Sequence, residues 1–380
     1  MHYNWFSVIK SCTKPYPAKD ALAQKEIAML DSITIENFRG IERTEIKELT
    51  RISLISGRNN VGKTTVLEAL FLLMDHTTID SFAKLGGFRG SLINGGVSLW
   101  EPLFYQMDVD RRIKICVSEG ATTACLTYEK DENYLPYNTP GMSEDMLAQF
   151  RSATKSTYSL LFKYMVDDYN EEGHFSLNGI NIMRDMKTNL LGNEIRAMRA
   201  TQFLNATIAR VSDSVLNGIG KLELSGKKSI IIAILKELDP RIEDILTLSL
   251  QGITQLYLRI AGKLIPLQYA GDGVMKLLNI CLAVLERKNG LVLIDEIESG
   301  FHYSMYKKLW RIIDKISKES NCQVIATTHS YELIQAVQES PMEIDDFSYY
   351  RMEQGNHDTS VFRYSYGMLD SALVAEMEVR

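Results

Sequence analysis

The nine residues from position 57 to position 65 constrain the fold of this chain more than any other stretch. They read Gly-Arg-Asn-Asn-Val-Gly-Lys-Thr-Thr and fit the phosphate-binding pattern G-x-x-x-x-G-K-[ST]. Residues 51–56 before them are β-rich, and residues 66–74 after them contain no Gly or Pro and are typical of a helix. The sequence therefore predicts a strand, a phosphate-binding loop and a helix, in that order.

The residue types of this loop suit a metal-bound nucleoside triphosphate. The glycines allow successive backbone N–H groups to converge on an anion, and the start of the helix adds a partial positive charge. Lys63 brings a cation to the outer phosphates, which makes it a candidate catalytic residue, and the Thr64 hydroxyl can ligate Mg²⁺. The predicted nucleotide-binding residues here are Gly57, Arg58, Asn59, Asn60, Val61, Gly62, Lys63, Thr64 and Thr65.

Two later strands are predicted to deliver the remaining chemistry. Residues 291–294 form an apolar run that ends in Asp295 and Glu296, as a buried parallel strand does when it presents carboxylates to a nucleotide. We predict Asp295 as a Mg²⁺ ligand and Glu296 as the base that orients water. Residues 323–330 repeat the scheme and present His329, where a γ-phosphate could be sensed. A helix N-cap for the two acids is disfavoured because Lys63 and Thr64 lie upstream. A structural role for His329 is disfavoured because it lies at the tip of the strand that follows the Asp-Glu strand.

Gly271, Asp272 and Gly273 precede a predicted helix over residues 275–286. Two glycines at a helix start indicate a second anion site. A Gly-x-Gly turn is by itself a weak pattern, and its position shortly before Asp295 strengthens it. One chain would then present two phosphate-binding helix ends.

The patterned part of the chain begins near Met29. Residues 1–28 lack a clear period, so we expect a disordered extension or a stretch upstream of the true start. Residues 29–142 form the lobe with the phosphate-binding loop, and residues 237–380 form the lobe with Asp295 and His329. Residues 143–236 between them are expected to be a mainly helical insertion, with helices over 146–165, 195–216 and 228–238.

Composition excludes some functions and leaves others open. A net charge of −6 argues against a chain that coats nucleic acid, although a local basic patch could bind it. No apolar run reaches the length of about 18 to 20 residues that spans a bilayer, so we expect no membrane association. The five cysteines form no C-x-x-C pair and suit a reducing cytosol, which predicts a cytoplasmic protein.

With these residues in view, the chain resembles the ATP-binding heads of the SMC, RecF and OLD (overcoming lysogenization defect) group of ABC-type ATPases. Residues 35–40, Ile-Glu-Asn-Phe-Arg-Gly, look like the opening strand of such heads, and residues 57–64 look like their Walker A loop. Residues 270–273 resemble the signature loop, residues 291–296 the Walker B strand, and His329 the switch histidine. Gln106 is a candidate counterpart of the Q-loop residue.

The resemblance implies an α/β P-loop NTPase fold, with a mixed or parallel sheet flanked by helices and an antiparallel β-subdomain. It also implies hydrolysis of ATP to ADP and phosphate. A homodimer or higher homo-oligomer is implied as well, in which the signature loop of one protomer, Gly271 to Gly273, closes over the ATP of the other. Stand-alone ATPases of this group act beside a separately encoded effector, so the resemblance further implies a partner protein and a role in phage defence.

The chain departs from the group in two ways. The predicted insertion is short and lacks sustained heptads, so it is not the coiled-coil arm of an SMC protein. Residues 330–380 are too few for the Toprim nuclease domain of OLD proteins. A RecF-like module that clamps DNA remains the alternative function. The ATPase subunit of a transporter is disfavoured, because the opening strand and the Gly-Asp-Gly loop are not transporter-like.

Overall fold

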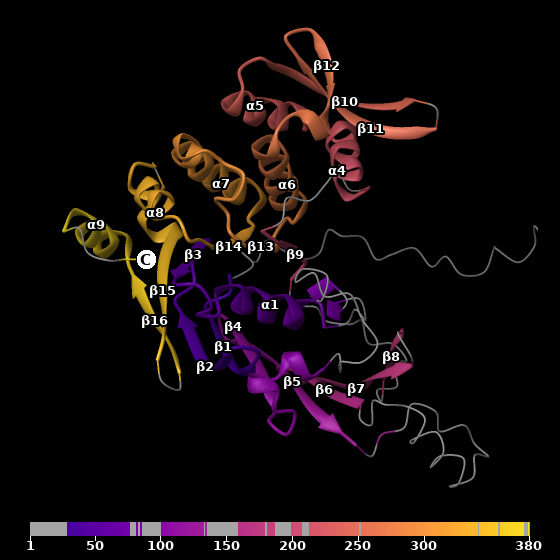
Figure 1. Cartoon of the computed structure of the whole chain (residues 1–380), viewed down its shortest axis with the longest axis vertical. Coiled ribbons are helices and arrows are strands. Elements are labelled where there is room, and N and C mark those ends of the chain that lie inside the picture. Colours follow the sequence, from indigo (N-terminus) through magenta and orange to yellow (C-terminus); the bar gives the residue numbers. More distant parts are fainter. Residues whose placement is uncertain are drawn as a thin grey trace, which may run out of the picture.

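The computed structural model describes most of the chain. The described residues are 29–76, 81–82, 84–85, 100–132, 134, 159–178, 181–186, 199–206, 213–250, 252–340, 342–355, 358–375 and 379. The predicted extension, residues 1–28, lies outside them. Within them the strands form three sheets (Figure 1).

A six-stranded sheet, ordered β16-β15-β3-β14-β13-β9, forms the centre of the molecule. Its strands are β3 (Ile52–Gly57), β9 (Thr201–Leu204), β13 (Leu291–Ile294), β14 (Gln323–Thr327), β15 (Phe347–Gln354) and β16 (Thr359–Tyr364). All neighbours are parallel except β15 and β16. Every residue of β3, β13 and β14 is buried, as expected for parallel strands that are covered on both faces.

One face of this sheet is covered by α1 (Lys63–Met74), which a seven-stranded antiparallel sheet covers in turn (Figure 1). That sheet has the order β2-β1-β4-β5-β6-β7-β8. Its strands are β1 (Ser32–Phe38), β2 (Ile41–Lys47), β4 (Ile113–Glu119), β5 (Thr122–Asp131), β6 (Ser159–Val166), β7 (Tyr169–Asn178) and β8 (Asn181–Met186). Nearly all of α1 is buried because it packs between two sheets.

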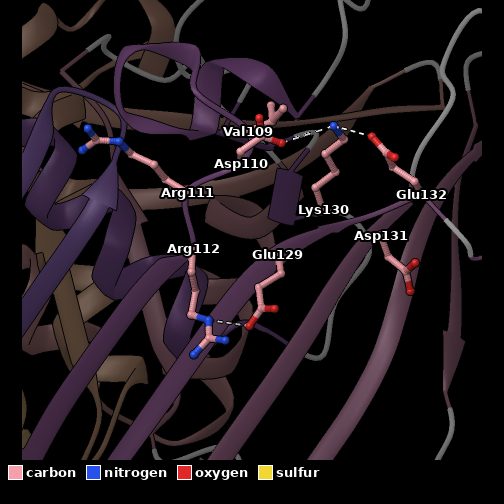
Figure 2. Close-up of a pocket in the computed structure, with 8 residues that line it drawn as sticks. All are labelled: Val109, Asp110, Arg111, Arg112, Glu129, Lys130, Asp131 and Glu132. Carbon is pink, nitrogen blue, oxygen red and sulfur yellow. Dashed lines mark hydrogen bonds and ion pairs between the residues drawn. The ribbon is translucent and has the colours of Figure 1, made fainter.

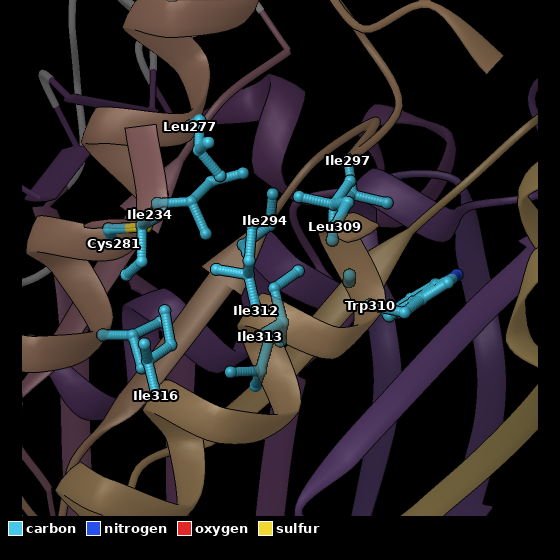
Figure 3. Close-up of a cluster of buried hydrophobic side chains, with 14 of the residues drawn as sticks. Ile234, Leu277, Cys281, Ile294, Ile297, Leu309, Trp310, Ile312, Ile313 and Ile316 are labelled. Carbon is cyan, nitrogen blue, oxygen red and sulfur yellow. The ribbon is translucent and has the colours of Figure 1, made fainter. Parts of the chain in front are cut away.

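The opposite face is covered by α6 (Asp272–Glu286), α7 (Tyr306–Ser320) and α8 (Tyr331–Gln338), while α9 (Tyr366–Val374) packs at the β15–β16 side. Figure 3 shows the core that results, a buried cluster that contains Ile294 of β13 together with Ile313 and Ile316 of α7. The apolar residues of α7 recur along one face of the helix, which is the pattern of a helix that lies on a sheet. This packing fixes the position of the end of β13, which Asp295 directly follows.

A three-stranded antiparallel sheet lies at the far end from the seven-stranded one (Figure 1). Its strands are β10 (Ile242–Leu250), β11 (Ile253–Ile260) and β12 (Lys263–Pro266), and it packs with α4 (Asp213–Leu224) and α5 (Lys228–Leu238). Five short 3-10 segments complete the described elements: η2 (Glu101–Leu103), η3 (Tyr105–Met107), η4 (Leu267–Tyr269), η5 (Tyr303–Met305) and η6 (Ile344–Asp346).

The prediction of a mainly helical insertion is wrong for much of residues 143–236. Residues 159–166, which were expected to end a helix, form β6, and residues 201–204, expected in the middle of another, form β9. Leu160, Phe162 and Tyr164 are buried and alternate with more exposed neighbours, so the period along β6 is two rather than 3.6. The helix over 228–238 is confirmed as α5, and residues 146–158 lie outside the described residues.

Cys116 and Cys125, which face each other across β4 and β5, form a disulfide. No spacing pattern in the sequence predicted this bond, and a disulfide is unusual in the reducing environment that the cysteines were expected to indicate. The pairing depends on strand register, which brings the two Cα atoms to 4.1 Å. Among the described residues, no helix combines the length and the apolar character needed to cross a bilayer.

Candidate functional site

The parallel strands β3, β14 and β13 end at the same edge of the central sheet, which we call the carboxyl edge. The register pairs Ile55 of β3 with Thr327 of β14, and Ala326 of β14 with Ile294 of β13. The Gly57 loop, Thr327 and Asp295 are therefore neighbours at the ends of adjacent strands. Ligands of open α/β sheets bind at such edges.

The backbone of the phosphate-binding loop requires its two glycines. Gly57 has φ 141°, and a Cβ there would lie 2.4 Å from the carbonyl oxygen of Met352. Gly62 has φ 99° and caps the N-terminus of α1, with Ile41 close beside it. Positive φ values are unfavourable for any residue that has a Cβ atom, so both positions favour glycine. Arg58, Asn59 and Asn60 between them are exposed, as a loop that receives a ligand must be.

Lys63 is buried at the first position of α1. Its ammonium donates to the carbonyl oxygens of Gly57 and Arg58, at 2.7 and 2.8 Å. Burial lowers the pKa of Lys63 to about 8, and the carboxylates of Asp295, Glu298 and Glu296 partly oppose that change. The Lys63 ammonium is thus held by two backbone carbonyl oxygens, and among the described residues it forms no ion pair with an acid.

Thr64 and Asp295, the two predicted Mg²⁺ ligands, lie in direct contact. The Thr64 hydroxyl donates to Asp295 Oδ1 at 2.9 Å, and the Thr327 hydroxyl donates to the same oxygen at 2.6 Å. A hydroxyl and a carboxylate are hard oxygen donors, which Mg²⁺ prefers, and the ion commonly keeps waters and takes phosphate oxygens as its other ligands. These donors fit Mg²⁺. The sequence analysis did not identify Thr327, which orients Asp295 from β14, the strand between β3 and β13.

Glu296 and His329 also face each other at this edge. Glu296 Oε1 lies 3.8 Å from His329 Nε2, and Ser299 donates to Glu296 Oε2 at 3.2 Å. Both side chains remain partly exposed, so water can reach them. Glu296 has φ 44°, a left-handed backbone that costs a non-glycine residue of order 1–3 kcal/mol. Its N–H donates to Thr327 Oγ1 at 2.9 Å, which helps to hold that conformation.

Glu298 is a further residue at the carboxyl edge that the sequence did not single out. Its Oε1 accepts a hydrogen bond of 2.6 Å from the backbone N–H of His329. Its Oε2 is buried and has no hydrogen-bond partner within the described part of the chain. Glu298 thereby ties the loop after β13 to the tip of β14. The one signal in the sequence that could have identified Glu298 is its position two residues after Glu296.

The Gly271–Gly273 loop is confirmed as the start of a helix, α6, but it is not joined to the phosphate-binding loop. Gly271 caps the helix with φ 91°, and Gly271 and Asp272 are exposed. A Cβ on Gly273 would lie 3.0 Å from the carbonyl oxygen of Gly300. Among the described side chains, no hydrogen bond or ion pair connects Asp272 to the Lys63 loop. Gln106, the Q-loop candidate, is exposed in η3.

A surface hollow near the end of η3 offers a contrasting set of charges (Figure 2). We call it the Arg111 hollow; its lining residues are Val109, Asp110, Arg111, Arg112, Glu129, Lys130, Asp131 and Glu132. Arg112 pairs with Glu129 at 2.5 Å, and Lys130 pairs with Glu132 at 2.5 Å and with Asp110 at 3.3 Å. Arg111 pairs outside the hollow with Glu42 at 2.8 Å. These matched charges do not make an anion site.

The fold and the carboxyl edge define a P-loop NTPase with an ABC-type ATPase head. A family model described as an AAA ATPase domain matches residues 29–178 and 127–334, and the chain belongs to this family. These findings confirm the predicted α/β fold with an ABC-type ATPase head and the predicted membership of the AAA ATPases.

Two relatives and one solved structure are similar to the chain. It is 26% identical over 341 residues to an ATP/GTP phosphatase of Helicobacter pylori, across 83% of this chain and 90% of that protein. A shorter match, 44% identical over 46 residues, joins 12% of this chain to 21% of the uncharacterized protein MJECL10 of Methanocaldococcus jannaschii. The crystal structure of the SmcHead bound to the C-winged helix domain of ScpA aligns with a TM-score of 0.50 and 13% identity. That alignment covers 89% of this chain and 98% of the other, and it shows the fold alone.

Proposed function

We propose that the protein is an ATP-hydrolysing switch that dimerises around ATP and signals to a separately encoded effector in phage defence, in the cytoplasm. The observation that carries the proposal is the meeting of three groups at one sheet edge: the buried Lys63, the Thr64–Asp295 pair and the Glu296–His329 pair. A relative described as an ATP/GTP phosphatase, which aligns over most of its length, supports hydrolysis.

Each of these groups has a place in the reaction. A water oxygen forms a bond to the γ-phosphorus while the bond from that phosphorus to the β–γ bridging oxygen breaks, which releases ADP. Glu296 accepts a proton from the attacking water, and His329 donates a hydrogen bond to a γ-phosphate oxygen. Lys63 leaves the carbonyls of Gly57 and Arg58 for the phosphates. Mg²⁺ held by Thr64 and Asp295 would supply positive charge at the β- and γ-phosphates.

The homodimer is proposed because, among the described residues of one chain, no hydrogen bond or ion pair joins the Gly271–Gly273 loop to the Lys63 loop. A two-fold axis lets each chain lend its exposed helix N-terminus to the nucleotide of the other. Asp272→Trp places a bulky ring at the exposed start of α6 and should block that approach while leaving Lys63 and Thr64 intact. We avoid Gly273 for this purpose because it packs against Gly300 in the same chain.

Mixing two inactive variants tests the shared site. Lys63→Ala protein and Asp272→Trp protein should each lack ATPase activity, whereas a mixed dimer has one site with both defects and one with neither. We expect partial recovery of phosphate release in the mixture, measured with ATP and with GTP. Light scattering that shows mixed dimers, without any recovery, would overturn the two-fold arrangement.

The effector and the defence role are supported by the resemblance to the OLD group. Affinity capture of the Glu296→Gln protein, which should hold ATP without turnover, is expected to retain the effector in an ATP-dependent manner. Capture that is identical for Glu296→Gln and Lys63→Ala would contradict signalling by the nucleotide state. An ATP-dependent shift of duplex DNA, weakened by salt, would instead favour the RecF-like alternative.

A further inference from the structure

Lys276 is a buried cation at the carboxyl edge that the reaction described above does not use. It lies on α6, one helical turn after Asp272, and its side chain is almost fully buried, at 3% exposure. Its ammonium makes long hydrogen bonds of 3.5 Å to the backbone carbonyl oxygens of Asp295 and Glu296. Within the described residues it forms no ion pair with a carboxylate.

A buried charge without a paired acid is costly, so its retention calls for a reason. Burial lowers the pKa of Lys276, while the nearby carboxylates of Asp295, Glu298 and Glu296 oppose that change. A leucine or methionine would fill the same space without the desolvation penalty. Simple packing of α6 against β13 therefore does not account for a lysine here.

The carbonyl that Lys276 contacts belongs to the residue with the strained backbone. Glu296 has φ 44°, and its N–H and C=O are both held: the N–H by Thr327, the C=O by Lys276 and by the N–H of Ser299 at 3.0 Å. Strained conformations persist only where the surroundings over-determine them. Of the residues that bond the Glu296 backbone, Lys276 is the one that lies on α6.

The start of α6 makes a second contact with the same loop, since Gly273 lies against the Gly300 carbonyl. The N-terminus of α6 and the loop after β13 thus form one packed unit. Through these contacts a displacement of α6 would reach the backbone of Glu296.

We propose that Lys276 is a positioning residue that couples the Gly271–Gly273 loop to the catalytic Glu296 of the same chain. When a partner's nucleotide docks at the N-terminus of α6, Lys276 transmits the docking to the backbone of Glu296 and sets the carboxylate for its own nucleotide. This inference rests on the proposed ATPase dimer. It predicts that recovery in the mixture of Lys63→Ala and Asp272→Trp proteins is small but measurable, because the site with an intact Lys63 loop uses the Glu296 of the Asp272→Trp chain.

Lys276→Met tests the positioning role, because it keeps an unbranched side chain of nearly the same length and removes its charge. We expect kcat for ATP to fall about 10- to 100-fold, the range of a lost hydrogen bond to a charged group, while the KM changes less than about threefold. The melting temperature should stay level or rise, since a buried charge has been removed. Lys276→Arg should restore part of kcat. Asn279→Leu, one turn further along α6 where the side chain bonds only the Met275 carbonyl, is the control and should keep wild-type kcat.

A double-mutant cycle tests the coupling itself. The cycle uses Asp272→Ala, a milder change at the same exposed helix start that should leave measurable turnover. If Lys276 acts through the signature loop, the Asp272→Ala, Lys276→Met double variant should be no slower than the slower single variant, because both changes break one route. A double variant whose fold-loss of kcat equals the product of the two single losses would overturn the coupling. Wild-type kcat in Lys276→Met, with Asp272→Trp impaired, would overturn the inference and leave the proposed function standing. An unimpaired Asp272→Trp protein would overturn the proposed dimer itself.

Discussion

The carboxyl edge and the Arg111 hollow place cations beside carboxylates in opposite ways. At the carboxyl edge, Lys63 and Lys276 are buried and bond backbone carbonyls, although three acids lie close enough to influence both pKa values. In the hollow, Arg112 and Lys130 each pair directly with acidic side chains at the surface (Figure 2).

The difference shows which cations are available to a ligand. A lysine that bonds only carbonyls can exchange them for phosphate oxygens and gain a charge-assisted bond. An arginine already paired with glutamate gains little, because it must give up an equivalent partner, and exposed pairs of this kind contribute about 0–1 kcal/mol. Both regions place cations beside carboxylates, and burial together with pairing distinguishes the candidate nucleotide site from the solvated surface.

Glu296→Gln should give the largest effect, because it removes the proposed base while preserving size and hydrogen-bonding shape. We expect kcat to fall by about 100- to 10,000-fold, with ATP binding retained. Single-turnover phosphate release and binding of a fluorescent ATP analogue would measure the two quantities. Hydrolysis at the wild-type rate would show that the carboxyl edge does not place its base at Glu296.

Asp295→Asn should act on the metal. The carboxylate that accepts hydrogen bonds from Thr64 and Thr327 becomes a neutral amide, so we expect the Mg²⁺ concentration for half-maximal ATPase activity to rise about 10- to 100-fold. Titration of activity with Mg²⁺ at saturating ATP checks this. An unchanged Mg²⁺ dependence would remove Asp295 from the ligand set.

Glu298→Gln should have an intermediate effect. The amide oxygen can still accept the bond from the His329 N–H, but a neutral acceptor is weaker, so we expect kcat to fall about fivefold. Thermal unfolding should show little change. A loss as large as that of Glu296→Gln would mean that Glu298, rather than Glu296, acts on the water.

Arg112→Ala should have the smallest effect, and it tests the Arg111 hollow rather than the carboxyl edge. Its pair with Glu129 is largely exposed on the arginine side, so the free energy of unfolding should change by less than about 1 kcal/mol. The kcat for ATP should stay within about twofold of wild type, since a paired surface charge makes no contact with the reaction. A marked loss of nucleotide or DNA binding would show that the hollow is a ligand site after all.

The local patterns of the chain predicted much of the fold. The continuous apolar runs that became β13 and β14 identified buried parallel strands, and the glycine pattern identified the loop before α1. The same approach failed at β6, where apolar residues occur often enough to suit a helix and only their alternation, visible in the burial of Leu160, Phe162 and Tyr164, distinguishes a strand. Tertiary pairing with β5 and β7 decided that segment.

The sequence by itself determined which chemical groups reach the carboxyl edge, because Lys63, Thr64, Asp295, Glu296 and His329 each follow or begin an element whose type is encoded locally. Only the tertiary structure decided which neighbouring residues form hydrogen bonds to these groups. Thr327 bridges to Asp295 because β14 lies between β3 and β13, and Lys276 reaches the Glu296 carbonyl because α6 packs on that sheet face. Such contacts join residues far apart in the chain, and their geometry follows from strand order and helix packing, which no local pattern contains.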